Sequence, residues 1–242
     1  MTRPSISIHA SPSITWQGAA AVKMQHGLKA IGLDANITQS RTRESDTAIL
    51  MGTTLWTGVE DGNYLLVDRA SFKDPEFVSL VWNGHGRRGN HMVPEKPLGR
   101  WERMGVEILP WRNGNRIVLC GQHETWSPHY ARCEDWYKTV RATHFRSHPA
   151  GDNPTGLPRV SNWDDTALAV TLNSSVGVDA ILNGISTATF DEGAMAWDIT
   201  THSVRGAARP DRRPWLEWLS WTQWHWDEIE AGKPIKHLFE DM

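Results

Sequence analysis

The first half of the chain contains three short apolar runs, and an alanine-rich segment lies between the first and the second. The runs Ser5–Ile8, Asp46–Met51 and Tyr64–Val67 have the length and the hydrophobicity of buried strands. The segment Trp16–Ile31 is rich in Ala, contains no Pro and is followed by Gly32, which is typical of a helix with a C-terminal glycine. This order of strand, helix, strand and strand predicts an α/β fold.

The second half of the chain repeats this alternation after a stretch rich in Gly and Pro. Residues 83–89 and 94–99 contain too many of these residues for a regular element. Beyond them the sequence predicts strands at 117–120, 143–146, 168–172 and 185–190, and helices at 130–140, 177–183 and 214–230. We therefore expect two small α/β domains, residues 1–110 and 111–213, and a C-terminal helix, residues 214–242, that crosses back to the first domain.

Composition and charge narrow the class of protein. The chain has 242 residues, of which 39% are hydrophobic and 22% charged, as in ordinary globular proteins. The 25 basic and 28 acidic residues give a net charge of −3, so no global positive field favours nucleic acid or membranes. The N-terminal segment lacks the pattern of a signal peptide, and no apolar run is long enough to span a membrane. We expect a cytoplasmic protein.

The two cysteines, Cys120 and Cys133, are too few for a disulfide framework and fit a reducing compartment. His123 and His129 lie near Cys133 in the sequence, but the spacing matches neither a CxxC nor an HExxH pattern. The sequence therefore predicts no metal site.

The strongest local signal follows the predicted strand 168–172. Ser174, Ser175 and Gly177 open the next predicted helix, where hydroxyls and backbone N–H groups can bind a phosphate. Asp179, one turn later, is placed to accept hydrogen bonds from ribose hydroxyls. A simpler interpretation stays open, in which the serines cap the helix and Asp179 offsets its dipole.

A second group of polar residues follows neighbouring strands. Arg146 and His148 come at the end of the predicted strand 143–146, and Gln122 follows the strand 117–120. In an open parallel sheet, ligands bind outside the carboxyl ends of the strands. We expect these three side chains at the same edge as Ser174, where a cation and donors would bind a diphosphate.

These motifs resemble the nucleotide-sugar half of GT-B glycosyltransferases. The closest resemblance is to capsule-polysaccharide-type transferases and to short transferase-like proteins of tailed bacteriophages. The residues that carry it are Ser174-Ser-x-Gly177, the acidic Asp179, Ala180-x-x-x-Gly184, Arg146-x-His-Pro149, the tail 211–232, and in the first half Leu65–Arg69 and Val81–Gly84. The chain is shorter than usual two-domain members, and many relatives carry Glu in place of Asp179.

The resemblance implies two small Rossmann-like halves facing a cleft. It implies that Arg146, His148, Ser174, Ser175 and Asp179 hold a nucleotide-sugar donor, taken to be a UDP-sugar. We expect Gln122 and Gly177 to contribute to the same donor site. The absence of an Asp-x-Asp triplet agrees with metal-independent donor binding, in which cations and a helix N-terminus stabilise the leaving diphosphate.

An inverting transferase needs a general base near the acceptor hydroxyl. Asp68, at the end of a predicted strand, is the first candidate, and His85, in the glycine-rich loop, is the second. Asp68 could equally form a surface ion pair with Arg69 or Arg43. A base role for Asp68 is favoured because strand ends position side chains better than loops do.

The acceptor stays open among DNA, a nucleotide, a sugar and a protein. A hydroxymethylated pyrimidine in phage DNA would have to be flipped and stacked on an aromatic side chain such as Trp82, Trp56 or Trp101, with Arg87 and Arg88 nearby. The net charge of −3 argues against DNA. Two other classes also stay open: a non-catalytic nucleotide- or sugar-binding or structural phage protein, and a GT-B-like sugar-nucleotide epimerase.

Tryptophan is over-represented, with 14 Trp against 3 Tyr and 5 Phe. Trp215, Trp218, Trp221 and Trp224 recur at every third position of the predicted C-terminal helix. We expect this stripe to pack the helix across the two halves, so that most of the tryptophan surplus is structural.

Overall fold

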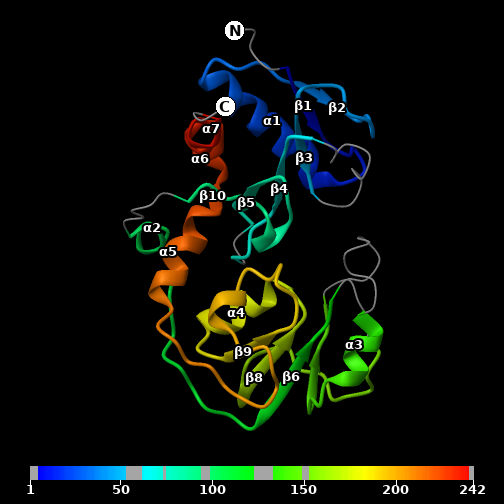
Figure 1. Cartoon of the computed structure of the whole chain (residues 1–242), viewed down its shortest axis with the longest axis vertical. Coiled ribbons are helices and arrows are strands. Elements are labelled where there is room, and N and C mark those ends of the chain that lie inside the picture. The colour runs from blue at the N-terminus through cyan, green and yellow to red at the C-terminus, as the bar shows by residue number, and fades with distance from the viewer. Residues whose placement is uncertain are drawn as a thin grey trace. The chain divides into compact units, whose positions relative to one another are not determined.

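The computed structural model describes residues 5–52, 62–72, 75–93, 99–122, 133–148 and 153–239. It divides into two compact units, Met1–Pro97 with Ser220–Met242, and Leu98–Leu219 (Figure 1). Residues 98–110, which we expected in the first domain, are grouped with the second unit. There the Leu109 N–H donates to the Leu182 carbonyl at 2.9 Å, and Arg212 Nη2 donates to the Leu109 carbonyl at 2.7 Å.

The first unit is built on a mixed sheet of six strands in the order β10-β5-β4-β3-β1-β2. Strands β1 to β4 run parallel to their neighbours, and β5 and β10 add an antiparallel edge. The elements of this unit are β1 (Ile6–His9), α1 (Thr15–Ala30), β2 (Asn36–Thr38), β3 (Thr47–Met51), β4 (Tyr64–Arg69), β5 (Phe77–Trp82), η1 (Gly86–Arg88), β10 (Gln223–His225), α6 (Trp226–Glu230) and α7 (Lys233–Phe239).

The central strands of this sheet are buried on both faces, which explains their continuous hydrophobic runs. Ile49, Met51 and Leu65 belong to a large core that includes residues of α1, α6 and α7. Leu50 and Leu66 alternate with them and form a second cluster on the opposite face. Helix α1 lies beside α6 and α7 in Figure 1.

The second unit is built on four parallel strands in the order β7-β6-β8-β9. Helices α3 and α4 cover opposite faces of the sheet (Figure 1): Tyr137 of α3 packs on Leu119 and Phe145, and Ala180 of α4 packs on the other face. The elements are α2 (Arg100–Arg103), β6 (Arg116–Cys120), α3 (Cys133–Thr139), β7 (His144–Arg146), β8 (Thr166–Thr171), α4 (Val176–Leu182), β9 (Ser186–Thr189), η3 (Trp197–Ile199) and α5 (Arg213–Trp221), whose last two residues belong to the first unit.

The α/β fold class predicted from the sequence is confirmed, and both units contain the parallel strands and covering helices of Rossmann-like folds. The single helix predicted over residues 214–230 is wrong. It is divided into α5, β10 and α6, because Gln223–His225 pairs with β5. The His225 side chain then caps α6 by accepting from the Asp227 N–H.

The predicted stripe of four tryptophans on one helix is therefore wrong in its last member: Trp215, Trp218 and Trp221 lie on α5, and Trp224 lies on β10. Trp215 is buried on α5 and its indole N–H donates to the Met195 carbonyl at 2.8 Å, within the second unit. Trp224 lies on β10 and is buried in the core of the first unit. These two residues stabilise separate units, which confirms a structural role for both but not a shared helix face. No helix in the described part of the chain is long and apolar enough to cross a membrane.

Candidate functional site

The sheet of the second unit has a topological switch point between β6 and β8. The connection from β6 leads through α3 to β7 on one side, and the connection from β8 leads through α4 to β9 on the other. The two connections leave in opposite directions at the carboxyl ends of these neighbouring strands, which is the usual place for a ligand in such sheets. Gln122 follows β6 by two residues and Ser174 follows β8 by three.

Gln122 connects the ends of the two strands. Its Nε2 donates to Asn173 Oδ1 at 2.7 Å, and its Oε1 accepts from Thr171 Oγ1 at 3.1 Å. Its backbone N–H donates to the Tyr137 hydroxyl of α3 at 2.5 Å. The residue is buried, and both its amide nitrogen and its amide oxygen make hydrogen bonds, so Gln122 fixes the geometry of the edge. The sequence analysis did not identify Asn173, Thr171 or Tyr137, which contribute only ordinary polar groups after or beside a strand.

Arg146 lies at the carboxyl end of β7 and is held on several sides. Its Nη1 donates to the Ser161 carbonyl at 3.0 Å, and its guanidinium lies 4.5 Å from the ring centroid of Trp163. Its Nη2 lies 3.8 Å from Asp179 Oδ2, and the side chain is 19% exposed. Arg146 is thus a mostly buried cation that still reaches the surface at this edge.

His148 is brought to the same edge, two residues after β7. The chain passes close to the end of β6 here, because a Cβ on Gly121 would come within 2.9 Å of the His148 backbone nitrogen. The Gly121 N–H donates to the Arg146 carbonyl at 2.8 Å. Gly121 therefore allows the two strand ends to approach so closely.

The carboxylate of Asp179 is buried among protein donors. Its Oδ2 accepts from the Trp163 indole N–H at 2.8 Å, and its Oδ1 accepts from Asn183 Nδ2 at 3.2 Å. The side chain is only 8% exposed. The sequence analysis did not identify Trp163, because a tryptophan in a polar loop shows no pattern until its partner is known.

The two serines take different positions at the start of α4. The Ser174 hydroxyl accepts from the Val176 N–H at 3.3 Å, so this residue acts as a cap, the simpler of the two interpretations. Ser175 is exposed, and its side chain makes no capping hydrogen bond. Gly177 is buried, and a Cβ there would meet Thr171 Cγ2 at 3.1 Å, so it allows α4 to pack closely on β8.

A buried thiol lies beneath this edge. Burial raises the pKa of Cys120 to about 12, and the charges of Arg146 and Asp179 both act on it. Cys120 is therefore protonated and is a poor metal ligand. Within the described residues, no group of three or more His, Cys, Asp or Glu could hold a metal ion. His123 and His129 lie outside the described residues.

The two candidate bases lie in the first unit. Asp68 is the penultimate residue of β4, and its Oδ1 accepts from the Arg69 N–H at 2.7 Å. Desolvation raises the pKa of Asp68, while the positive charge of protonated His85 acts in the opposite direction. The two side chains are thus close enough to interact electrostatically. His85 directly precedes η1, in a loop where Gly86 has a positive φ of 53°.

The residues proposed to contact an acceptor differ in exposure. Trp82 is 5% exposed and packs edge-on against Phe239, with ring centroids 5.1 Å apart, in the core of the first unit. Arg87 and Arg88 lie on η1, the first half-buried and the second exposed. Trp101 is half-buried on α2, and Trp56 lies outside the described residues.

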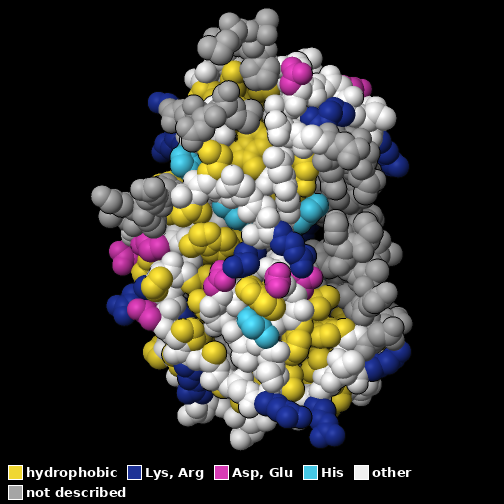
Figure 2. Space-filling view, viewed as in Figure 1, with side chains coloured by type: hydrophobic (Ala, Val, Ile, Leu, Met, Phe, Trp, Pro, Cys, Tyr) yellow, Lys and Arg dark blue, Asp and Glu magenta, His cyan; other side chains and the backbone are white. Residues whose placement is uncertain are grey.

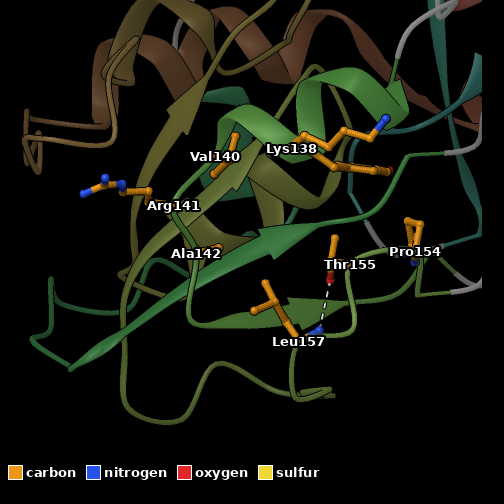
Figure 3. Close-up of a pocket in the computed structure, with 8 residues that line it drawn as sticks. Lys138, Val140, Arg141, Ala142, Pro154, Thr155 and Leu157 are labelled. Atoms are coloured by element: carbon orange, nitrogen blue, oxygen red, sulfur yellow. Dashed lines mark hydrogen bonds between the residues drawn. The ribbon is translucent and has the colours of Figure 1, made fainter.

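A cavity of about 540 Å³ lies elsewhere in the second unit, between the C-terminal end of α3 and the segment 154–157 (Figure 3). In Figure 3 the Arg141 side chain extends away from the other lining residues. The cavity is lined by Tyr137, Lys138, Val140, Arg141, Ala142, Pro154, Thr155 and Leu157. Tyr137 connects it with the candidate site, because its hydroxyl accepts a hydrogen bond from the Gln122 N–H.

Comparison with solved structures identifies a glycosyltransferase-like fold. The chain is similar to KpsC of Thermosulfurimonas dismutans, a β-Kdo 2,7 transferase, with a TM-score of 0.53 and 13% sequence identity. The similarity covers 96% of this chain and 99% of the KpsC chain. No protein-family model matches the sequence, and no curated protein matches it. The chain therefore has a glycosyltransferase-like fold, which agrees with the resemblance to capsule-polysaccharide-type transferases.

Proposed function

We propose that this protein is a glycosyltransferase that moves a sugar from a nucleotide-sugar donor to a hydroxyl group without a metal ion. The observation that carries this proposal is the set of polar groups at the switch point of the second unit. Gln122, Arg146, His148 and Ser174 all follow carboxyl ends of neighbouring parallel strands. This is where open α/β sheets bind nucleotides. The glycosyltransferase-like fold supports the proposal.

The donor contacts follow from the chemistry of these groups. Arg146 supplies a positive charge with N–H groups arranged to match phosphate oxygens, and His148 supplies a second donor. Gln122 holds the ends of β6 and β8 at a fixed separation through Asn173 and Thr171. Ser175 carries an exposed hydroxyl at the same edge. We take a UDP-sugar as the first donor to test.

The reaction requires a base on the acceptor side. In an inverting transfer the base removes the acceptor hydroxyl proton, and the oxygen attacks the anomeric carbon. The bond from that carbon to the phosphate oxygen breaks, and the nucleotide leaves with the bonding electron pair. We assign the base role to the Asp68–His85 pair, because the two groups interact and a carboxylate can orient a histidine that accepts a proton. Arg146 stabilises the charge on the leaving phosphate.

The acceptor class is best approached by exclusion. The burial of Trp82 in the core removes one support for a flipped DNA base. On the face shown in Figure 2, Lys and Arg side chains of the described residues occur in small separate groups rather than in one continuous patch. With a net charge of −3, this distribution is unlike the basic surface of DNA-binding enzymes. We therefore favour a small hydroxyl acceptor, a sugar or a nucleotide, over a hydroxymethylated pyrimidine in phage DNA.

The test begins with donor binding. Thermal unfolding is measured with UDP-, GDP- and ADP-sugars and with an activated Kdo donor, and the nucleotide that stabilises the protein is confirmed by calorimetry. Arg146→Ala should lose this stabilisation, whereas Arg141→Ala, an exposed arginine in the same unit, should keep it.

Turnover then separates the function classes. Release of free nucleotide with a sugar acceptor supports the transferase. Binding without turnover on any acceptor favours a non-catalytic module, and conversion of the donor sugar without an acceptor favours an epimerase. If no nucleotide stabilises the wild-type protein, the proposal fails. A gel shift with duplex DNA at low salt tests whether DNA can be the acceptor.

A further inference from the structure

The carboxylate of Asp179 has little capacity left for a ligand. Both of its oxygens accept hydrogen bonds from protein groups, Trp163 Nε1 at 2.8 Å and Asn183 Nδ2 at 3.2 Å. Only 8% of the side chain is exposed. A residue that binds ribose must present accessible oxygens to two hydroxyl groups, and a carboxylate that is 8% exposed offers little surface for such contacts.

Arg146 is in the opposite situation. Among the described residues, only one of the five N–H groups of this guanidinium has a hydrogen-bond acceptor, the Ser161 carbonyl at 3.0 Å. The Asp179 oxygen at 3.8 Å is too distant for a hydrogen bond but close enough for an ion pair. The guanidinium is stacked on Trp163 at 4.5 Å, so its orientation is fixed while most of its donors stay available.

Trp163 connects the two residues. Its ring lies under the guanidinium of Arg146 and its indole N–H donates to Asp179, so the same side chain orients both. Trp163 is 4% exposed, and the cluster it belongs to packs under α4. An anion that meets Arg146 therefore meets a cation whose position is determined by Trp163, Asp179 and Ser161.

We infer that Asp179 and Trp163 are positioning residues that hold the Arg146 guanidinium for the donor phosphate, and that Asp179 does not contact the donor ribose. This inference rests on the proposed function, and it replaces the ribose role that the family resemblance implies for Asp179. The Asp179 side chain reaches its two protein partners from the first turn of α4.

The direction in which Asp179→Asn changes the affinity for UDP tests the inference. Asp179→Asn keeps an oxygen that can accept from Trp163 but removes the charge that holds Arg146. Removing a nearby negative charge would by itself tighten the binding of an anion, so weaker binding indicates lost positioning. We expect UDP to bind about tenfold more weakly to Asp179→Asn, as measured by calorimetry. Tighter or unchanged binding would overturn the inference.

Two thermodynamic cycles distinguish the positioning role of Asp179 from a contact between Asp179 and the donor ribose. The weakening by Asp179→Asn should persist with 2′-deoxy-UDP and 3′-deoxy-UDP, and it should disappear when Arg146 is replaced by Ala. If the effect instead disappears with a deoxyribose ligand and persists without Arg146, Asp179 binds ribose and the inference is wrong. Asp164→Asn is the matched control, because Asp164 is exposed beside Trp163 in the sequence and its carboxylate accepts from Asn162.

Inorganic pyrophosphate makes the test independent of the proposed function. The Trp163 indole N–H gives a nuclear magnetic resonance signal that is assigned by its loss in Trp163→Phe. Pyrophosphate should shift this signal in the wild-type protein and not in Arg146→Ala. If no nucleotide binds but pyrophosphate shifts the signal, the proposed function fails and the role of Asp179 and Trp163 stands. If pyrophosphate leaves the signal in place, the inference fails.

Discussion

Gln122 Nε2 donates a hydrogen bond of 2.7 Å to Asn173 Oδ1, and this bond joins the loops that follow β6 and β8. The two residues are 51 positions apart in the chain. The bond lies where the connections of the second sheet diverge, so the position of the candidate phosphate-binding groups depends on it.

Replacing Gln122 should therefore affect both stability and binding. Gln122→Ala removes the acceptor of the Thr171 hydroxyl proton and the donor to Asn173 Oδ1, which we expect to lower the free energy of unfolding by about 1–3 kcal/mol. The affinity for UDP should fall as well, because the two strand ends lose their connection. Urea unfolding and calorimetry measure the two effects. Gln25→Ala is the control: it removes a bond to the Ala35 carbonyl in the first unit, and UDP affinity should not change.

Two glycines of α1 should respond to alanine in opposite directions. At Gly27 a Cβ would lie 2.0 Å from the Ile229 carbonyl oxygen, which belongs to α6 and cannot move independently. Gly27→Ala should therefore lower the free energy of unfolding by about 1–3 kcal/mol or more. At Gly18 nothing lies within 4 Å of the added Cβ, so Gly18→Ala should raise stability by about 0.5–1 kcal/mol. Urea unfolding of both variants measures the contrast, and equal effects would show that α1 does not pack on α6.

The buried parallel strands were predictable from the sequence because their burial on two faces leaves a continuous apolar signal. Tyr64–Arg69 and Thr166–Thr171 are examples. Gln223–His225 gave no such signal, since three polar and aromatic residues become a strand only by pairing with β5. The helical pattern of the surrounding tryptophans was stronger locally, and tertiary pairing overrode it.

The candidate site was predictable in part for a similar reason. Arg146, His148 and Gln122 could be found because strand ends of a parallel sheet share one edge. Trp163 could not, because its role depends on a hydrogen bond to Asp179, 16 residues further along the chain. The Ser174 hydroxyl accepts a hydrogen bond from the Val176 N–H, so it is not available only for a ligand. The spacing of residues in the sequence does not predict this hydrogen bond.

Asp68 should make the stability of the first unit depend on pH in an unusual direction. Desolvation raises the pKa of its carboxyl above the ordinary value of an aspartate in the folded state. Below the pKa of the unfolded chain, Asp68 is protonated in both the folded and the unfolded state, and its contribution to the free energy of unfolding is fully present. As the pH rises from about 4 through the raised pKa, the unfolded chain ionises first, so the folded state loses stability.

Asp68→Asn removes this loss. Its stability relative to wild type should increase as the pH rises from about 4 to 7, measured by urea unfolding at each pH. Asp46→Asn is a control of opposite sign, because hydrogen bonds from Ser5 lower the pKa of Asp46. That variant should lose stability relative to wild type above the unfolded pKa, and the difference should shrink as the pH falls. The same trend in both variants would contradict the assignment.

The Asp68–His85 pair should act as one catalytic unit if it supplies the base. His85→Gln and Asp68→Asn should each lower kcat by about 100-fold to 10,000-fold, and the double variant should lower it little further. The affinity for the donor should be unchanged in all three, because the candidate donor groups lie in the second unit. Initial rates give kcat, and calorimetry gives the donor affinity.

Two exposed residues of the first unit serve as controls for this cycle. His26→Gln removes a histidine that pairs with Glu230, and Asp46→Asn removes a carboxylate that pairs with Ser5. Neither change should alter kcat. Strictly additive losses would mean that Asp68 and His85 act separately, and full activity in Asp68→Asn would leave His85 as the base without a carboxylate to orient it. A fall in donor affinity that matches the fall in kcat would place the defect in folding rather than in proton transfer, since a base that acts on the acceptor hydroxyl contributes only after the donor is bound.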